Sequence, residues 1–100
     1  MNSQRLQFLS LRNLPARLTT EEASWLLGFN PHDIPILVAA GLLKPLGQPA
    51  QNAVKYFAAV TICELKQDVH WQSRASKEIM HYWRKRNERK NPISASQIDQ

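Results

Sequence analysis

Apolar residues recur at helical spacing in two short stretches between residues 18 and 43, and each stretch ends at a glycine. In the first stretch, Thr19 and Glu22 have the spacing of a capping box, in which each side chain accepts a hydrogen bond from the other residue's backbone N–H. Gly28 can adopt the left-handed conformation that closes a helix. We therefore predict a first helix between Thr19 and Gly28, with its inward face formed by Ala23, Leu26 and Leu27.

The second stretch predicts another short helix, from about Pro31 to Ala40. Asn30 is a favourable N-cap residue, and Pro31 fits the first helical turn because its missing N–H is not needed there. Pro35 either lies inside this helix and removes one backbone hydrogen bond, or it moves the helix start to Asp33. Two helices joined by a four-residue turn and closed by a glycine predict a helix-turn-helix. The helical spacing assigns the core of the second helix to Ile34, Leu37 and Val38.

The next segment predicts a β-hairpin from Leu42 to Phe57. Its first strand is Leu42–Lys44 and its second strand is Val54–Phe57. The residues between these strands include Pro45, Gly47 and Pro49, as expected of a loop.

The apolar pattern gives less definite predictions before residue 18 and after residue 57. Residues 1–17 predict a short helix or an extended arm, which either adds cover to the core or is exchanged between the copies of a dimer. Residues 58–90 contain neither proline nor glycine and allow one long helix. Their apolar stripe weakens in the middle, which favours two helices, Ala58–Asp68 and Ser73–Arg89. Residues 91–100 are polar and predict a disordered tail.

The order and spacing of these pieces resemble the winged helix-turn-helix of MerR-like regulators and phage-type excisionases. The resemblance covers about residues 18–69 and rests on Glu22–Asn30, Ala40–Pro45 and Lys55–Phe57, with Ile62 and Leu65 downstream. It implies a mainly α fold, namely a winged helix-turn-helix with a two-stranded β-hairpin wing and C-terminal helices. Together with the flanking segments interpreted above, the predicted organisation is an N-terminal arm or short helix (1–17), the winged domain (18–69), a C-terminal basic helix (70–90) and a disordered tail (91–100).

The same resemblance implies DNA binding, as a transcriptional regulator or an excisionase-like protein, with the second helix as recognition helix. Regulators of this kind often carry an effector domain after the winged part. This chain has no room for one, so we expect no small-molecule effector.

The outward face of the predicted second helix is unusually apolar for a base-reading helix. Base pairs are distinguished mainly by hydrogen bonds, and on this face only His32 can donate or accept one. We therefore expect weak base readout. Exposed apolar faces more often mark protein contacts. The alternative is a protein-interaction or dimerisation module that kept the fold and lost DNA reading. Trp25 either anchors that contact or packs on the N-terminal arm. The candidate interface is Trp25, Pro35, Ile36, Ala39 and Ala40.

The charge favours a polyanionic partner but is unevenly placed. The net charge is +5 and the pI about 9.8, and five of the thirteen cations fall between residues 84 and 90. A basic helix end either contacts phosphate or complements its own dipole. Amides in the hairpin loop either bond DNA or are ordinary solvated side chains. The candidate DNA-binding residues are His32, Lys44, Gln48, Gln51, Asn52, Lys55, Arg84, Lys85 and Arg86.

No residues have the arrangement of a catalytic or metal site. His32, His70, His81 and Cys63 lack zinc-site spacing, and Cys63 beside Glu64 is a poor nucleophile. One cysteine excludes an internal disulfide and fits a reducing compartment. No apolar run approaches the ~20 residues of a membrane span, and we find no signal peptide. We therefore expect a cytoplasmic protein that is not an enzyme, uses no cofactor or metal and does not contact membranes.

Overall fold

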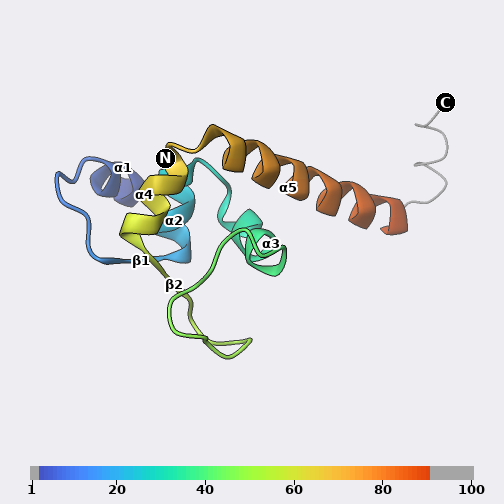
Figure 1. The fold of residues 1–100 in the computed structure, drawn as a ribbon, viewed down its shortest axis with the longest axis horizontal. Helices are drawn as coiled ribbons and strands as arrows, with labels where there is room; N and C mark the ends of the chain where they lie inside the picture. The colour runs from blue at the N-terminus through green and yellow to red at the C-terminus, as the bar shows by residue number, and fades with distance from the viewer. Residues whose placement is uncertain (1–2, 91–100) are drawn as a thin grey trace.

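The computed structural model describes residues 3–90, so the predicted tail lies outside the described residues. The prediction of a mainly helical fold is confirmed, because the two strands have only three residues each. Figure 1 shows α5 extending away from the other helices, while the segment between α3 and β2 projects below them. The elements in chain order are α1 (Ser3–Leu9), β1 (Arg17–Thr19), α2 (Thr20–Leu27), the 3-10 turn η1 (Pro31–Asp33), α3 (Ile34–Ala39), β2 (Tyr56–Ala58), α4 (Ala59–Lys66) and α5 (Val69–Lys90).

Local hydrogen bonds define both ends of α2, as the sequence predicts. The N–H of Glu22 donates to Thr19 Oγ1 at 3.1 Å, and the N–H of Thr19 donates to Glu22 Oε1 at 3.0 Å. At the other end Gly28 has a φ of +80° and donates its N–H to the Ser24 carbonyl oxygen at 2.8 Å. The capping box and the left-handed glycine are therefore confirmed.

The second helix begins differently from its prediction. Asn30 caps it as expected, because its side chain accepts the N–H of His32 at 3.2 Å. Pro35 has no N–H to donate to the Pro31 carbonyl in the α-helical pattern. The N–H of Ile34 donates to that carbonyl instead. Residues 31–33 therefore form a 3-10 turn, and α3 itself is only six residues long.

The predicted pairing of Leu42–Lys44 with Val54–Phe57 is wrong. The structure pairs β2 with β1 in an antiparallel sheet, with Leu18 opposite Phe57, and both side chains are buried. The backbone N–H groups of Leu42 and Leu43 both donate to the Leu37 carbonyl at the end of α3, at 2.9 and 3.3 Å. These two N–H groups are therefore not available for hydrogen bonds to a neighbouring strand. A single backbone bond, from the Leu46 N–H to the Tyr56 carbonyl at 2.8 Å, connects the projecting segment to β2.

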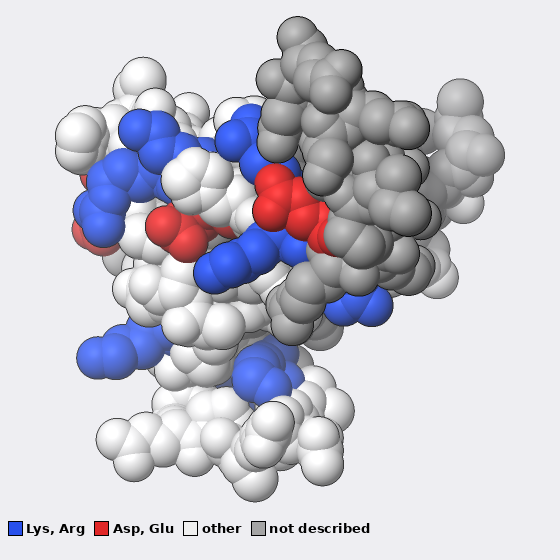
Figure 2. Space-filling model, turned by 90° about the vertical axis from the view of Figure 1, so that its right-hand side faces the viewer, with Lys and Arg blue, Asp and Glu red and all other residues white. Residues whose placement is uncertain are grey.

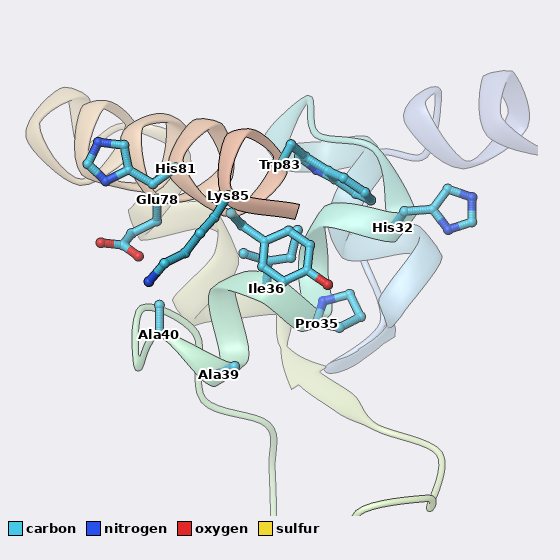
Figure 3. A pocket seen from close by; sticks show the side chains of 10 residues that line it. His32, Pro35, Ile36, Ala39, Ala40, Glu78, His81, Trp83 and Lys85 are labelled. Carbon is cyan, nitrogen blue, oxygen red and sulfur yellow. The ribbon is translucent and has the colours of Figure 1, made fainter. Parts of the chain in front are cut away.

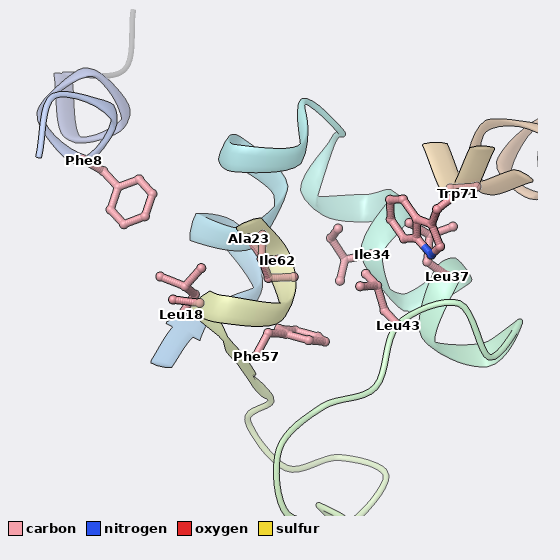
Figure 4. Packing of buried hydrophobic residues seen from close by; sticks show 11 residues of the cluster. Phe8, Leu18, Ala23, Ile34, Leu37, Leu43, Phe57, Ile62 and Trp71 are labelled. Atoms are coloured by element: carbon pink, nitrogen blue, oxygen red, sulfur yellow. The ribbon is translucent and has the colours of Figure 1, made fainter. Parts of the chain in front are cut away.

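One hydrophobic core joins these elements. Of the three residues predicted for the core face of the second helix, Ile34 and Leu37 are buried and Val38 is half-buried. Beyond the predicted winged region, Phe8 of α1 is also buried and packs against Trp25, with ring centroids 5.7 Å apart. Figure 4 shows this core between α2 and α4 and toward α5, with Leu18, Ala23, Phe57 and Ile62 on one side and Ile34, Leu37, Leu43 and Trp71 on the other.

Residues 58–90 form two helices, as favoured by the sequence, but the break comes earlier than predicted. Asp68 Oδ1 accepts the Trp71 N–H at 3.0 Å and so caps α5, which begins at Val69 and not at Ser73. The side-chain amide of Gln72 donates to the last carbonyls of α4. Trp71 is buried, and its indole N–H donates to the Leu42 carbonyl at 2.9 Å. None of the helices within residues 3–90 has the length and apolar character needed to cross a membrane.

Candidate nucleic-acid interface

The outer face of α3 is a ridge between two grooves. On one side, α3 and the second half of α5 enclose a groove of about 600 Å³, here called the α3–α5 groove. On the other side, α3, the start of α2 and residues 51–55 enclose a groove of about 670 Å³, here called the α3–loop groove. Pro35 and Ala39 line both grooves and are exposed, so they form the crest of the ridge.

A hydrogen bond between distant residues connects α5 to the turn before α3, and side-chain contacts within α5 surround it. The indole N–H of Trp83 donates to Asp33 Oδ1 at 3.1 Å, which ties α5 to the turn that precedes α3. The Trp83 ring also lies edge-to-face on Tyr82, with centroids 5.1 Å apart. Arg86 donates to the Tyr82 hydroxyl at 3.3 Å and places its guanidinium 6.0 Å from the Trp83 ring. Tyr82 and Trp83 line the α3–α5 groove and form its wall.

The three basic residues predicted at the end of α5 do not act on one surface. Lys85 lines the α3–α5 groove, and Figure 3 shows its side chain extending from α5 toward α3. Arg86 lies against Tyr82 and Trp83 instead. Consecutive residues of an α-helix lie about 100° apart around its axis, so Arg84 and Arg86 point in widely different directions. Only Lys85 of the three lines the groove beside α3.

The segment 44–55, here called the loop, projects beside α3 (Figure 1). Its residues 45–54 include no charged side chain, while Lys44 and Lys55 stand at its two ends. Gln48, Gln51 and Asn52 are exposed, which is compatible with both of their expected roles, DNA contact or ordinary solvation. Lys55 Nζ donates to the Gln51 carbonyl at 3.1 Å, a contact within the returning arm of the loop. Figure 2 shows the lower projection of the molecule as uncharged, with basic side chains above it.

Acidic side chains accompany the basic ones on this side of the molecule. Glu78 lines the α3–α5 groove, and Glu21 lines the α3–loop groove. Figure 2 shows Lys and Arg interspersed with Asp and Glu on the face that it presents. The positive potential here is therefore modest, and attraction to a polyanion depends on a few individual cations.

The structure brings together four of the nine predicted DNA-binding residues around the ridge. His32 and Lys85 lie along one side, and Gln51 and Lys55 along the other. The predicted apolar interface lies between them, except that Trp25 packs against Phe8 of α1, the other of its two expected roles. The helical spacing of Ala75, Ile79 and Trp83, with Tyr82 adjacent, predicts a core or dimer contact for the two aromatic residues. It does not identify their place beside α3, where Tyr82 and Trp83 form the groove wall.

No protein-family model, curated protein or solved structure matches this chain, so the interpretation of the interface depends on its own residues. Within residues 3–90, no three His, Cys, Asp or Glu side chains lie together in a way that could hold a metal ion.

Proposed function

We propose that this protein binds double-stranded DNA by placing α3 in the major groove, as a winged helix-turn-helix protein in which the loop takes the place of the wing. The observation that carries the proposal is the exposed ridge of α3 with a basic side chain on each side, Lys85 and Lys55. The major groove is about 12 Å wide and admits one α-helix. Cations on both sides of an inserted helix then face the two phosphate backbones that border the groove.

The arrangement of α2 and α3 supports this proposal. The two helices are joined by residues 28–33, which include the turn Gly28–Asn30 and η1. The loop leaves the end of α3 and returns to β2, so it lies beside α3 where a wing is expected. In this role the protein acts as a transcriptional regulator or an excisionase-like protein.

The same geometry limits the strength of binding. Each phosphate neutralised by a cation contributes about 0.9 to the slope of log affinity against log salt concentration. Lys55 and Lys85 line the two grooves and Lys44 stands at the base of the loop, so the slope is expected to be about 3. The crest of the ridge offers no hydrogen-bonding side chain for base edges, so base readout by α3 is weak.

The test is a double variant, Lys55→Gln with Lys85→Gln, compared with Lys66→Gln and Lys77→Gln. Both pairs remove two positive charges, but Lys66 and Lys77 line neither groove. Anisotropy of a fluorescent duplex, titrated at several salt concentrations, measures the slope. We expect it to fall by about 1.8 in the first variant and to stay unchanged in the second. Equal slopes in the two variants, or no salt-dependent binding by the unaltered protein, contradict the proposal.

A second candidate function is a two-fold dimer contact through the α3–α5 groove. The observation that favours it is the apolar lining of the groove, where Ile36 and Ala40 lie near Tyr82 and Trp83, which are 39% and 38% exposed. A two-fold contact buries the same patch on both copies.

Ala39→Glu separates these two functions. Ala39 is exposed on the crest, so the change adds a charge to the ridge without altering the core. If the ridge is a dimer contact, light scattering shows dimers before the change and monomers after it. If it binds DNA, the added carboxylate weakens DNA binding by repulsion from phosphate, and the molar mass does not change.

A further inference from the structure

We infer that the DNA favoured by this protein is rich in A·T pairs, read through thymine methyl groups by α3 and through the minor groove by the amides of the loop. This inference rests on the proposed DNA-binding function and names the class of sequence that the same surface prefers. Two separate features of the structure lead to it, one on the ridge and one on the loop.

The crest of α3 can favour only one feature of the major groove. The exposed side chains of α3 and its C-cap are Pro35, Ala39 and Ala40, none of which has a polar atom. Every base pair presents polar atoms in the major groove, but only thymine presents a methyl group there. Covering the polar edge of a G·C pair with an apolar surface removes water from groups that then lack a partner, which is unfavourable. Contact with a thymine methyl buries apolar surface on both sides.

The side chains at the tip of the loop can form hydrogen bonds with base edges in the minor groove. Gln48, Gln51 and Asn52 are exposed, and no charged residue lies between Lys44 and Lys55. Side-chain amides donate N–H groups, and A·T pairs present only acceptors in the minor groove. A G·C pair adds the guanine N2 amino group, itself a donor, so an amide NH2 that bonds the acceptors of an A·T pair meets a donor there unless the amide turns to present its oxygen. The loop therefore prefers A·T pairs for a reason independent of α3.

The length of the loop is compatible with reading the neighbouring groove. One helical turn of B-DNA is about 34 Å, so the major groove and the adjacent minor groove face the protein about 17 Å apart. The ten residues from 45 to 54 lead out and back through a turn in which the Ala53 N–H donates to the Ala50 carbonyl at 3.0 Å, so each arm reaches at most about 16 Å. Lys44 and Lys55, at the base of the loop, then lie near the phosphates that separate the two grooves.

Four duplexes of equal length test the inference with the full chain. The first is A·T-rich, and the second replaces each thymine by uracil, which removes only the methyl groups. The third is G·C-rich, and the fourth replaces each guanine by inosine, which removes only the N2 amino groups. We expect the first to bind most tightly and uracil to weaken binding by roughly fourfold for each thymine methyl that α3 covers. We expect inosine to bind more tightly than guanine.

A loop variant and a control variant test whether the loop is responsible for the difference between inosine and guanine duplexes. Gln51→Ala with Asn52→Ala removes two of the three amides at the tip, so it should reduce the difference between inosine and guanine duplexes and leave the difference between thymine and uracil. The control, Gln4→Ala with Gln7→Ala, removes two exposed amides from α1 and should preserve both differences. Salt-dependent binding with equal affinity for all four duplexes overturns this inference and leaves the proposed function standing. Absence of salt-dependent binding to every duplex overturns both.

Discussion

The two halves of α5 differ in how the rest of the molecule holds them. In the first half, Trp71 and Ala75 are buried in the core, and the Trp71 indole N–H donates to the backbone at the end of α3. In the second half, every residue from His81 to Glu88 is exposed. There the indole N–H of Trp83, donating to Asp33, ties the helix to the turn before α3.

This difference shows that α5 has two roles, one in the stability of the fold and one in forming the α3–α5 groove. The first half contributes to stability, since it buries large apolar surface against α3 and α4. The second half contributes a wall and a cation to the α3–α5 groove while burying little. Changes in the first half should therefore act on the free energy of unfolding, and changes in the second half on binding.

Trp71→Ala should have the largest effect. Replacing a buried tryptophan by alanine leaves a cavity and costs about 3–5 kcal/mol, and here the Leu42 carbonyl also loses its donor. Domains of this size have small total stabilities, so much of the population should unfold. Urea denaturation followed by circular dichroism measures the loss. A midpoint close to that of the unaltered protein contradicts a core role for this half.

Trp83→Phe should have an intermediate effect. The change keeps an aromatic ring but removes the N–H that donates to Asp33 Oδ1. The net contribution of one such hydrogen bond is about 1 kcal/mol. Hydrogen exchange should therefore accelerate in residues 80–88 and stay unchanged in residues 71–78. The control is Asp33→Asn, which keeps an acceptor oxygen and should alter exchange less. Faster exchange along the whole of α5 contradicts the division into halves.

Sequence reasoning succeeds where the determinants are local. The capping box of Thr19 and Glu22 and the left-handed Gly28 depend on residues a few positions apart, so their spacing alone predicts them. The apolar outer face of the second helix follows from helical spacing in the same way. The break before α5 is also determined locally, by Asp68, although the weakening of the apolar stripe favours a start at Ser73.

Sequence reasoning fails where a partner lies far along the chain. The pattern predicts a strand at Phe57, but its partner is Leu18, which alternation of apolar and polar residues cannot identify. The predicted hairpin would pair two segments that are close together in the sequence. The N–H groups of Leu42 and Leu43, which that hairpin would need, donate instead to the Leu37 carbonyl at the end of α3. The groove wall depends on a bond between Trp83 and Asp33, which are fifty residues apart. Whether this arrangement functions as a winged helix-turn-helix stays a prediction.

Arg84→Gln and Lys85→Gln should have the smallest effects on stability and the sharpest contrast in binding. Both side chains are exposed, so each change should alter the free energy of unfolding by less than about 0.5 kcal/mol. The two residues are adjacent and lose the same charge, but only Lys85 lines the groove beside α3. The slope of log affinity against log salt should fall by about 0.9 in Lys85→Gln and stay nearly constant in Arg84→Gln. Equal losses would mean that the end of α5 attracts DNA through its total charge, and that the position of Lys85 beside α3 is irrelevant.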